Sequence, residues 1–205
     1  MRLSKKSPLV FAAACVAWIG IGCSSNDKPS SPRAGIASTV GTGTEAGVND
    51  GTKCTIANEA WPTVGDPEST TNPTLADGDA LDQSTLAVTC TVKPAADGGF
   101  FVDGMVEIQG QSSFHIVGNV SPSGPQTGLT GTWSKSNAGT FQQVPQPAQG
   151  AKPADTCTMT YRAGVNPPVT AGRIWGTIIC PHAFHDAAHT CEGTAEFRFE
   201  NCTQE

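Results

Sequence analysis

The sequence predicts an all-β fold, a single disulfide-stapled β-sandwich of about eight antiparallel strands. Short runs in which apolar and polar residues alternate recur at regular spacing between turn residues, and no segment has a helical period. Charged residues make up 15%, below the usual quarter, and the chain has 23 glycines and 15 prolines. Low charge and many turn-forming residues favour strands joined by tight turns over a helical bundle.

The N-terminal segment, residues 1–22, has the pattern of a secretory signal peptide. Arg2, Lys5 and Lys6 precede an uncharged, mostly apolar run at Ser7–Gly22. This run is shorter than the roughly 20 residues that a membrane-spanning helix needs, although an uncleaved anchor helix is the alternative. The segment therefore predicts export.

The end of this segment, Gly20-Ile21-Gly22-Cys23, resembles the signal of bacterial lipoproteins, in which a cysteine after a small residue is acylated and becomes the first residue. Gly20 stands where leucine is usual, and Cys15 is a competing site with less apolar sequence before it. The resemblance implies a lipid anchor on Cys23 and a membrane as partner. Ser24 in place of aspartate implies sorting to the outer membrane. Two or more acyl chains on one residue would make a stable anchor.

The stretch 23–52 that follows has almost no large apolar residues and is rich in Ser, Thr, Gly and Pro. This composition predicts a lipid-anchored, flexible tether, with the β-sandwich domain occupying residues 53–205. Between Cys54 and Ser84 the signal is weak, and we expect one short strand near Cys54 followed by a long irregular excursion.

After this excursion the strand signals are regular. Each run places its apolar residues in one phase, which predicts a strand with one buried face. The predicted strands are Thr85–Val92, Phe100–Ile108, Ser113–Val120, Gly128–Trp133, Thr140–Val144, Cys157–Tyr161, Arg173–Ile179 and Ala195–Glu200.

The last two strands are expected to pair as a hairpin in which Ile174 faces Phe197. This register places Cys180 opposite Cys191 and predicts a disulfide between them at the base of a ten-residue loop. An even number of cysteines in an exported chain predicts three disulfides, although six cysteines allow 15 connectivities. The alternative is that the thiols bind a metal, but the sequence contains no Cys-x-x-Cys pair to support it. The six cysteines are Cys54, Cys90, Cys157, Cys180, Cys191 and Cys202.

Three histidines of this loop, His182, His185 and His189, have spacings of three and four. On a helix these spacings would place three imidazoles on one face, where they could bind Zn²⁺ or Cu²⁺ and Asp186 could complete the site. The alternative is a solvated hairpin loop that happens to contain histidines.

No motif for catalysis is present. A Ser/His/Asp set can be assembled from Ser113, His115 and Asp103, but their spacing does not indicate a catalytic triad. His115 also lies in the outward phase of its strand. Glu196 and Glu200 share a strand face with the basic Arg198 between them, which favours a cross-strand charge cluster over an acid/base pair.

Two further features bear on ligands. Trp61, Trp133 and Trp175 could form a sugar-stacking platform, although Trp175 is out of phase with its neighbours and both faces of its strand could be buried. The net charge is −6 and every acidic residue follows Cys23, which argues against nucleic acid and against charge-driven binding of anionic lipid.

The sequence therefore predicts a lipid-anchored cell-envelope protein whose β domain binds or displays a ligand without catalysis and without a cofactor. One alternative function is a periplasmic or surface metal-binding lipoprotein that uses the three histidines. Another is a hydrolase whose catalytic residues the sequence does not name. The sequence does not choose between a protein and a glycan as the ligand.

Overall fold

The computed structural model describes residues 30–42, 54, 56, 58–69, 71, 73–143, 156–186 and 189–205. The predicted signal peptide and the predicted lipidation site, Cys23, lie outside these residues. The described residues contain no helix, and hence none of the length and apolarity that a membrane span requires. The strands are β1 (Arg33–Gly41), β2 (Glu59–Val64), β3 (Leu75–Ala76), β4 (Ala80–Leu81), β5 (Ser84–Pro94), β6 (Phe100–Ile108), β7 (Ser112–Val120), β8 (Gln126–Lys135), β9 (Gly139–Gln143), β10 (Cys157–Tyr161), β11 (Val169–Thr170), β12 (Arg173–Asp186) and β13 (His189–Glu200).

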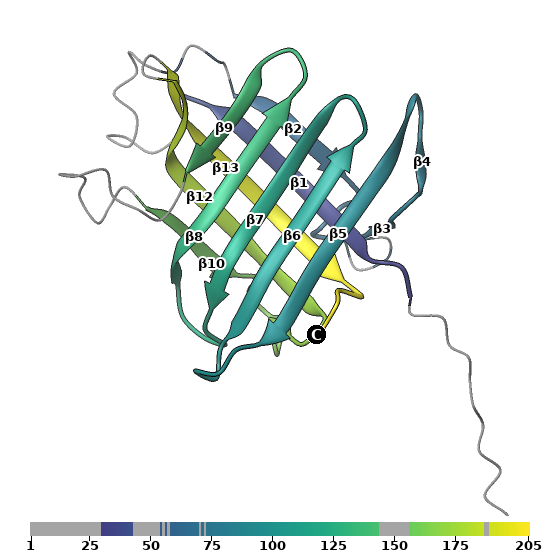
Figure 1. Cartoon of the computed structure of the whole chain (residues 1–205), viewed down its shortest axis with the longest axis vertical. Coiled ribbons are helices and arrows are strands. Elements are labelled where there is room, and N and C mark those ends of the chain that lie inside the picture. The colour runs from purple at the N-terminus through teal and green to yellow at the C-terminus, as the bar shows by residue number, and fades with distance from the viewer. Residues whose placement is uncertain are drawn as a thin grey trace, which may run out of the picture.

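The strands form one antiparallel sheet in the order β2-β1-β13-β12-β10-β8-β7-β6-β5-β4, with β9 paired to both β8 and β12. Figure 1 shows β5 to β9 as a front layer that crosses obliquely over β1, β2, β12 and β13. Because β10 joins β8 to β12, the sheet continues from one layer into the other and closes into a small barrel with extra strands. This arrangement replaces the predicted sandwich of about eight strands.

Two short segments close the opposite side of the barrel. The amide of Asp77, between β3 and β4, donates to the carbonyl of Pro32, and the amide of Gly78 donates to the carbonyl of Leu86, both at 2.9 Å. At the C-terminus the amide of Thr203 donates to the carbonyl of Cys90 at 2.9 Å. Backbone groups at this edge are therefore paired instead of being left open to another chain.

The barrel interior is filled by side chains from both layers. Phe114 packs with its ring centroid 5.4 Å from that of Trp133 and 6.1 Å from that of Phe197. Glycine makes room where the rings are largest: a Cβ on Gly104 would lie 2.7 Å from the ring of Phe199. The largest fully buried side chains are Trp61, Trp133, Phe114, Phe141, Phe197, Phe199, Ile36, Leu86, Ile116, Leu129, Met159 and Ile174.

The predicted tether is wrong for residues 33–41, which form β1 between β13 and β2. Ala34, Ile36, Ser38 and Val40 alternate inward and are all buried. The sequence resembled a linker because two of these four inward residues, Ala34 and Ser38, are small. In the structure their small size suits a central strand, since the outer face at Gly35 is also covered, with the carbonyl oxygen of Pro73 where a Cβ would be.

All eight strands predicted after residue 84 are present, with ends shifted by a few residues. The hairpin of β12 and β13 is also confirmed, but its register differs from the predicted one by two residues, so that Ile174 lies opposite Phe199 and Gly193 lies opposite Cys180. A shift of two keeps the same side chains on the buried face. Both strands also continue through the expected loop, with β-bulges after Cys180 and Phe184.

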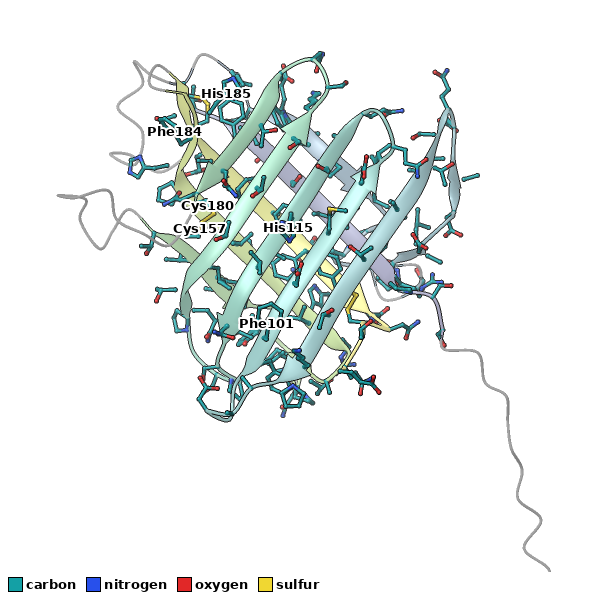
Figure 2. The ribbon with its side chains drawn as sticks, viewed as in Figure 1. Phe101, His115, Cys157, Cys180, Phe184 and His185 are labelled. Carbon is teal, nitrogen blue, oxygen red and sulfur yellow. A yellow bond between two sulfur atoms is a disulfide. The ribbon has the colours of Figure 1, made fainter. Side chains whose placement is uncertain are left out.

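The six cysteines form three disulfides, as predicted, but the expected Cys180–Cys191 bond is wrong. The bonds are Cys54–Cys191, Cys90–Cys202 and Cys157–Cys180, with Cα separations of 4.9, 4.8 and 4.1 Å. Figure 2 shows Cys157 and Cys180 on neighbouring strands. The shifted register explains the error, because it places Gly193 opposite Cys180 and moves Cys191 beyond the bulge, opposite Ala183.

Candidate ligand-binding groove

The three histidines of the predicted metal site lie on a β-hairpin instead of a helix. The ring of His185 stacks on Phe141 at 5.1 Å, and its Nδ1 lies 2.9 Å from the carbonyl oxygen of Thr140 (Figure 2). His182 is half-buried, and the side chain of His189 lies outside the described part of the chain. Among the described residues no three His, Cys, Asp or Glu side chains gather as a metal site would need.

His115 lies on the outer face of the front layer, as predicted (Figure 2). Its Nε2 is 2.8 Å from Oδ1 of Asp103, on the neighbouring strand β6. The structure shows no hydrogen bond from the hydroxyl of Ser113 to either residue. The three residues therefore do not form the continuous nucleophile–base–acid chain that hydrolysis by a serine would need.

Trp175 lies on the outer face of the other layer, between two arginines. The guanidinium carbon of Arg198 is 4.5 Å from the centroid of the indole, and that of Arg162 is 5.8 Å away. We call these residues, with Glu68, Glu196 and Glu200, the arginine–tryptophan cluster. The arginines occupy the space around the ring that a sugar would need, so the cluster is not an open stacking platform.

The charges of the arginine–tryptophan cluster satisfy one another, which confirms the predicted charge cluster. Arg162 pairs with Glu68 at 2.6 Å and with Glu196 at 3.0 Å, and Arg198 pairs with Glu200 at 2.6 Å. Burial raises the pKa of Glu196, and the neighbouring carboxylate of Glu68 raises it further, while Arg162 lowers it. These contacts fasten the segment after β2 to the barrel and leave little for a ligand.

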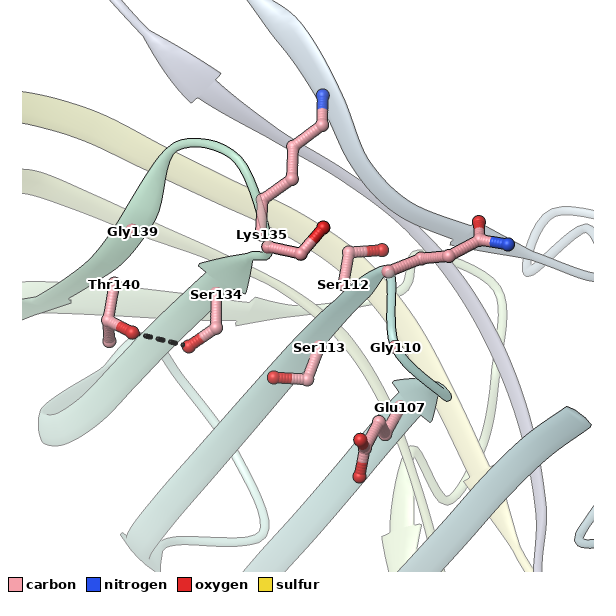
Figure 3. A pocket seen from close by; sticks show the side chains of 10 residues that line it. Glu107, Gly110, Ser112, Ser113, Ser134, Lys135, Gly139 and Thr140 are labelled. Atoms are coloured by element: carbon pink, nitrogen blue, oxygen red, sulfur yellow. Dashed lines mark hydrogen bonds between the residues drawn. The ribbon is translucent and has the colours of Figure 1, made fainter. Parts of the chain in front are cut away.

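A different surface gathers a row of polar side chains. Glu107, Ser113, Ser134 and Thr140 are paired directly across four neighbouring strands, β6 to β9. All four line one hollow of ≈ 290 Å³ that is open to solvent, and Figure 3 shows their side chains in a line. We call this hollow the groove, and the four residues its polar row.

Two hairpin turns form the wall of the groove. The turns after β6 and β8 are joined by a hydrogen bond of 2.9 Å from the amide of Ser136 to the carbonyl of Gln111. Lys135 stands at the same place, 2.9 Å from Glu59 on β2 and 5.6 Å from the centroid of the buried Trp61. The wall is thus braced against β2, and a second hollow of ≈ 380 Å³ lies on its other side.

Part of the hydrogen-bonding capacity of the groove is free. Within the described residues the structure gives the carboxylate of Glu107 and the hydroxyl of Ser113 no protein partner, whereas the hydroxyls of Ser134 and Thr140 are 2.8 Å apart. The side chain of Gln111 on the wall also has no protein partner among these residues. Free polar groups in a groove with a braced wall, in contrast to the paired charges around Trp175, favour this surface as the ligand site.

The groove could not be predicted from the sequence, because its residues are ordinary Ser, Thr and Glu positions far apart in the chain. The only available signal was their outward phase beside turns such as Gln109-Gly110-Gln111. No family model, curated protein or solved structure matches the chain.

Proposed function

We propose that this chain is an exported, lipid-anchored cell-envelope protein whose β-barrel domain binds a ligand in the groove without catalysis. The observation that carries the proposal is the polar row of Glu107, Ser113, Ser134 and Thr140, which lines one open groove and in which the side chains of Glu107 and Ser113 have no protein partner among the described residues. The interior of the barrel is packed with aromatic rings, so the outer surface is where a ligand has room.

Export and anchoring are supported by the cysteines and the N-terminal pattern. All six domain cysteines are paired, which suits an oxidising compartment outside the cytoplasm. The barrel begins with β1 at Arg33, so residues 24–32 separate it from the proposed lipid on Cys23. An extended segment of that length spans at most about 30 Å, which limits the distance between the start of β1 and the membrane surface.

A binding role fits the groove better than a reaction. Glu107 is the one carboxylate of the polar row, and no second acid lines the described groove. A pair of carboxylates or a nucleophile with its base is the usual minimum for hydrolysis. The polar row offers hydroxyls that donate and accept hydrogen bonds, which is what recognition of a polar ligand requires.

Anchoring is tested with Cys23→Ser in a Gram-negative host. The wild-type protein should be recovered in the outer-membrane fraction, and the variant should be unprocessed or released from it. If Cys23→Ser were processed and fractionated with the membrane as the wild type does, the lipid anchor would be wrong.

Ligand binding in the groove is tested by placing a photo-reactive amino acid at Gln111 in living cells. Its control is the same amino acid at Thr158, which is exposed on the outer face of β10, away from the groove. We expect a defined adduct at position 111 that is absent at position 158. Identical cross-linking at both positions would contradict a binding role for the groove.

A further inference from the structure

The polar row has a regular repeat that indicates the shape of the ligand. Its four residues occupy directly paired positions on adjacent strands, so their backbone positions are spaced by the strand separation of about 4.8 Å, although the hydroxyls of Ser134 and Thr140 approach to 2.8 Å. Three such intervals make a line of about 14 Å that runs across the strands. A repeat of this size is close to the length of one hexopyranose ring in a linear chain.

The chemistry of the row suits hydroxyl groups. Ser113, Ser134 and Thr140 each offer a hydroxyl, and Glu107 offers a carboxylate that accepts hydrogen bonds from the ligand. Gln111 adds an amide on the wall. From this repeat and this chemistry we infer that the groove binds a neutral, linear polysaccharide, about three sugar rings at a time. The inference rests on the proposed binding function and names its ligand class.

Charge selects against the anionic alternatives. The chain has a net charge of −6. Within the groove, the negative charge of Glu107 and the positive charge of Lys135 cancel, so the groove has no net positive charge. Lys135 is moreover paired with Glu59, so it is not a free cation for a phosphate or a uronate. A neutral chain avoids the repulsion that an acidic surface imposes on an anion.

The shape of the groove favours a segment bound along its length. A volume of ≈ 290 Å³ lies at the lower limit for sites that enclose a small molecule, and this groove is open. No aromatic side chain lines it, so binding depends on hydrogen bonds that water also offers. We therefore expect weak binding, with a Kd on the order of 1 mM, that strengthens with the number of sugar rings up to about three or four.

The test is a titration of the purified full-length protein, in detergent, with cellotetraose and with chitotetraose, followed by NMR or calorimetry. Both probes are neutral and linear, and only chitotetraose carries the N-acetyl groups found in cell-wall glycan. Cellobiose tests the dependence on length, and tetragalacturonate serves as the anionic counterpart. The critical variant is Ser113→Ala/Ser134→Ala, and the matched control is Thr158→Ala on β10.

We expect at least one neutral tetrasaccharide to bind, more tightly than cellobiose, and the double variant to lose about tenfold in affinity. Thr158→Ala should bind as the wild type does. Binding that persists unchanged in the double variant, binding of tetragalacturonate alone, or failure of both neutral probes would overturn the inference. Chitotetraose binding alone would point to cell-wall glycan as the source, and cellotetraose binding to an unsubstituted polysaccharide.

The adduct at position 111 separates this inference from the proposed function. If the partner cross-linked at position 111 is digested by a protease and contains no carbohydrate, it is a protein. That result would overturn the glycan ligand while leaving the groove as a binding site. The absence of any adduct specific to position 111, together with no oligosaccharide binding, would remove both.

Discussion

The ring of Trp133 lies directly against Gly193, in the middle of the barrel. A Cβ added to Gly193 would be 2.7 Å from the ring, closer than real Cβ contacts come. The indole Nε1 donates to the carbonyl of the next residue, Thr194, at 3.3 Å, which fixes the ring over this glycine. Because Gly193 is opposite Cys180, the fit of Trp133 holds the register of the C-terminal hairpin.

Gly193→Ala should therefore destabilise the domain by about 1–3 kcal/mol, because the rigid ring and the two backbones leave no space for a methyl group. Urea unfolding measures the free energy of unfolding. The double variant Gly193→Ala/Trp133→Phe should lose less unfolding free energy than the sum of the losses of the two single variants, because the smaller ring makes room for the methyl group. Strictly additive costs would show that the ring and the glycine are not coupled.

The fold could be predicted from the sequence where burial imposes an alternating pattern. The eight strands after residue 84 have this pattern, and each was found. β1 was missed because only two of its four inward positions, Ile36 and Val40, hold large apolar residues, and the rest of the strand is rich in Ala, Ser, Thr and Gly, as a linker is. Its place in the sheet depends on partners distant in sequence, β13 and β2, which local patterns do not reveal.

The register and the disulfides were harder to predict for a related reason. Alternation fixes which face a side chain occupies, but a shift of two residues preserves that face, so Phe197 and Phe199 were equally acceptable partners for Ile174. The actual choice depends on tertiary contacts such as that between Trp133 and Gly193. The groove was missed for the same reason, since the polar row exists only once four strands are in register.

The disulfide between Cys157 and Cys180 joins neighbouring strands over a sequence separation of 23, whereas Cys90–Cys202 spans 112 residues. The loop-entropy model assigns about 3 kcal/mol to the shorter loop and about 5 kcal/mol to the longer. Replacing both cysteines of a pair by alanine should thus lower the free energy of unfolding more for Cys90–Cys202. Denaturant titration of the two double variants gives the comparison, and an equal loss would contradict it.

His185 connects β12 to β9 through its stacking on Phe141 and its contact with Thr140. His185→Ala should therefore lower the free energy of unfolding by about 0.5–1.5 kcal/mol. Because this ring is already engaged in the protein, we expect Zn²⁺ to leave the melting temperature of the wild type unchanged. A rise with Zn²⁺ that His185→Ala abolishes would instead support the metal-binding alternative.

The protonation of Glu196 should make the stability of the fold depend on pH. Its carboxylate lies beside that of Glu68, and Arg162 pairs with both. Burial is the largest cause that raises the pKa of Glu196, followed by the charge of Glu68, with Asp66 adding to the effect. At neutral pH the charged form of the Glu196 carboxylate is therefore less stable in the folded protein than in the unfolded chain.

The sign of the pH dependence follows from this raised pKa. The folded state binds the proton of Glu196 more tightly than the unfolded state, so the stabilisation due to protonation is present at acidic pH and lost as the pH rises through the folded pKa. Glu196→Gln, which imitates the protonated side chain, should be more stable than the wild type at pH 7.5. The difference in unfolding free energy should shrink as the pH falls toward the ordinary glutamate pKa of about 4.3. Urea unfolding of both proteins across this pH range measures the difference. If the wild type were more stable than Glu196→Gln at pH 7.5, the ion pair with Arg162 would outweigh the cost of burial.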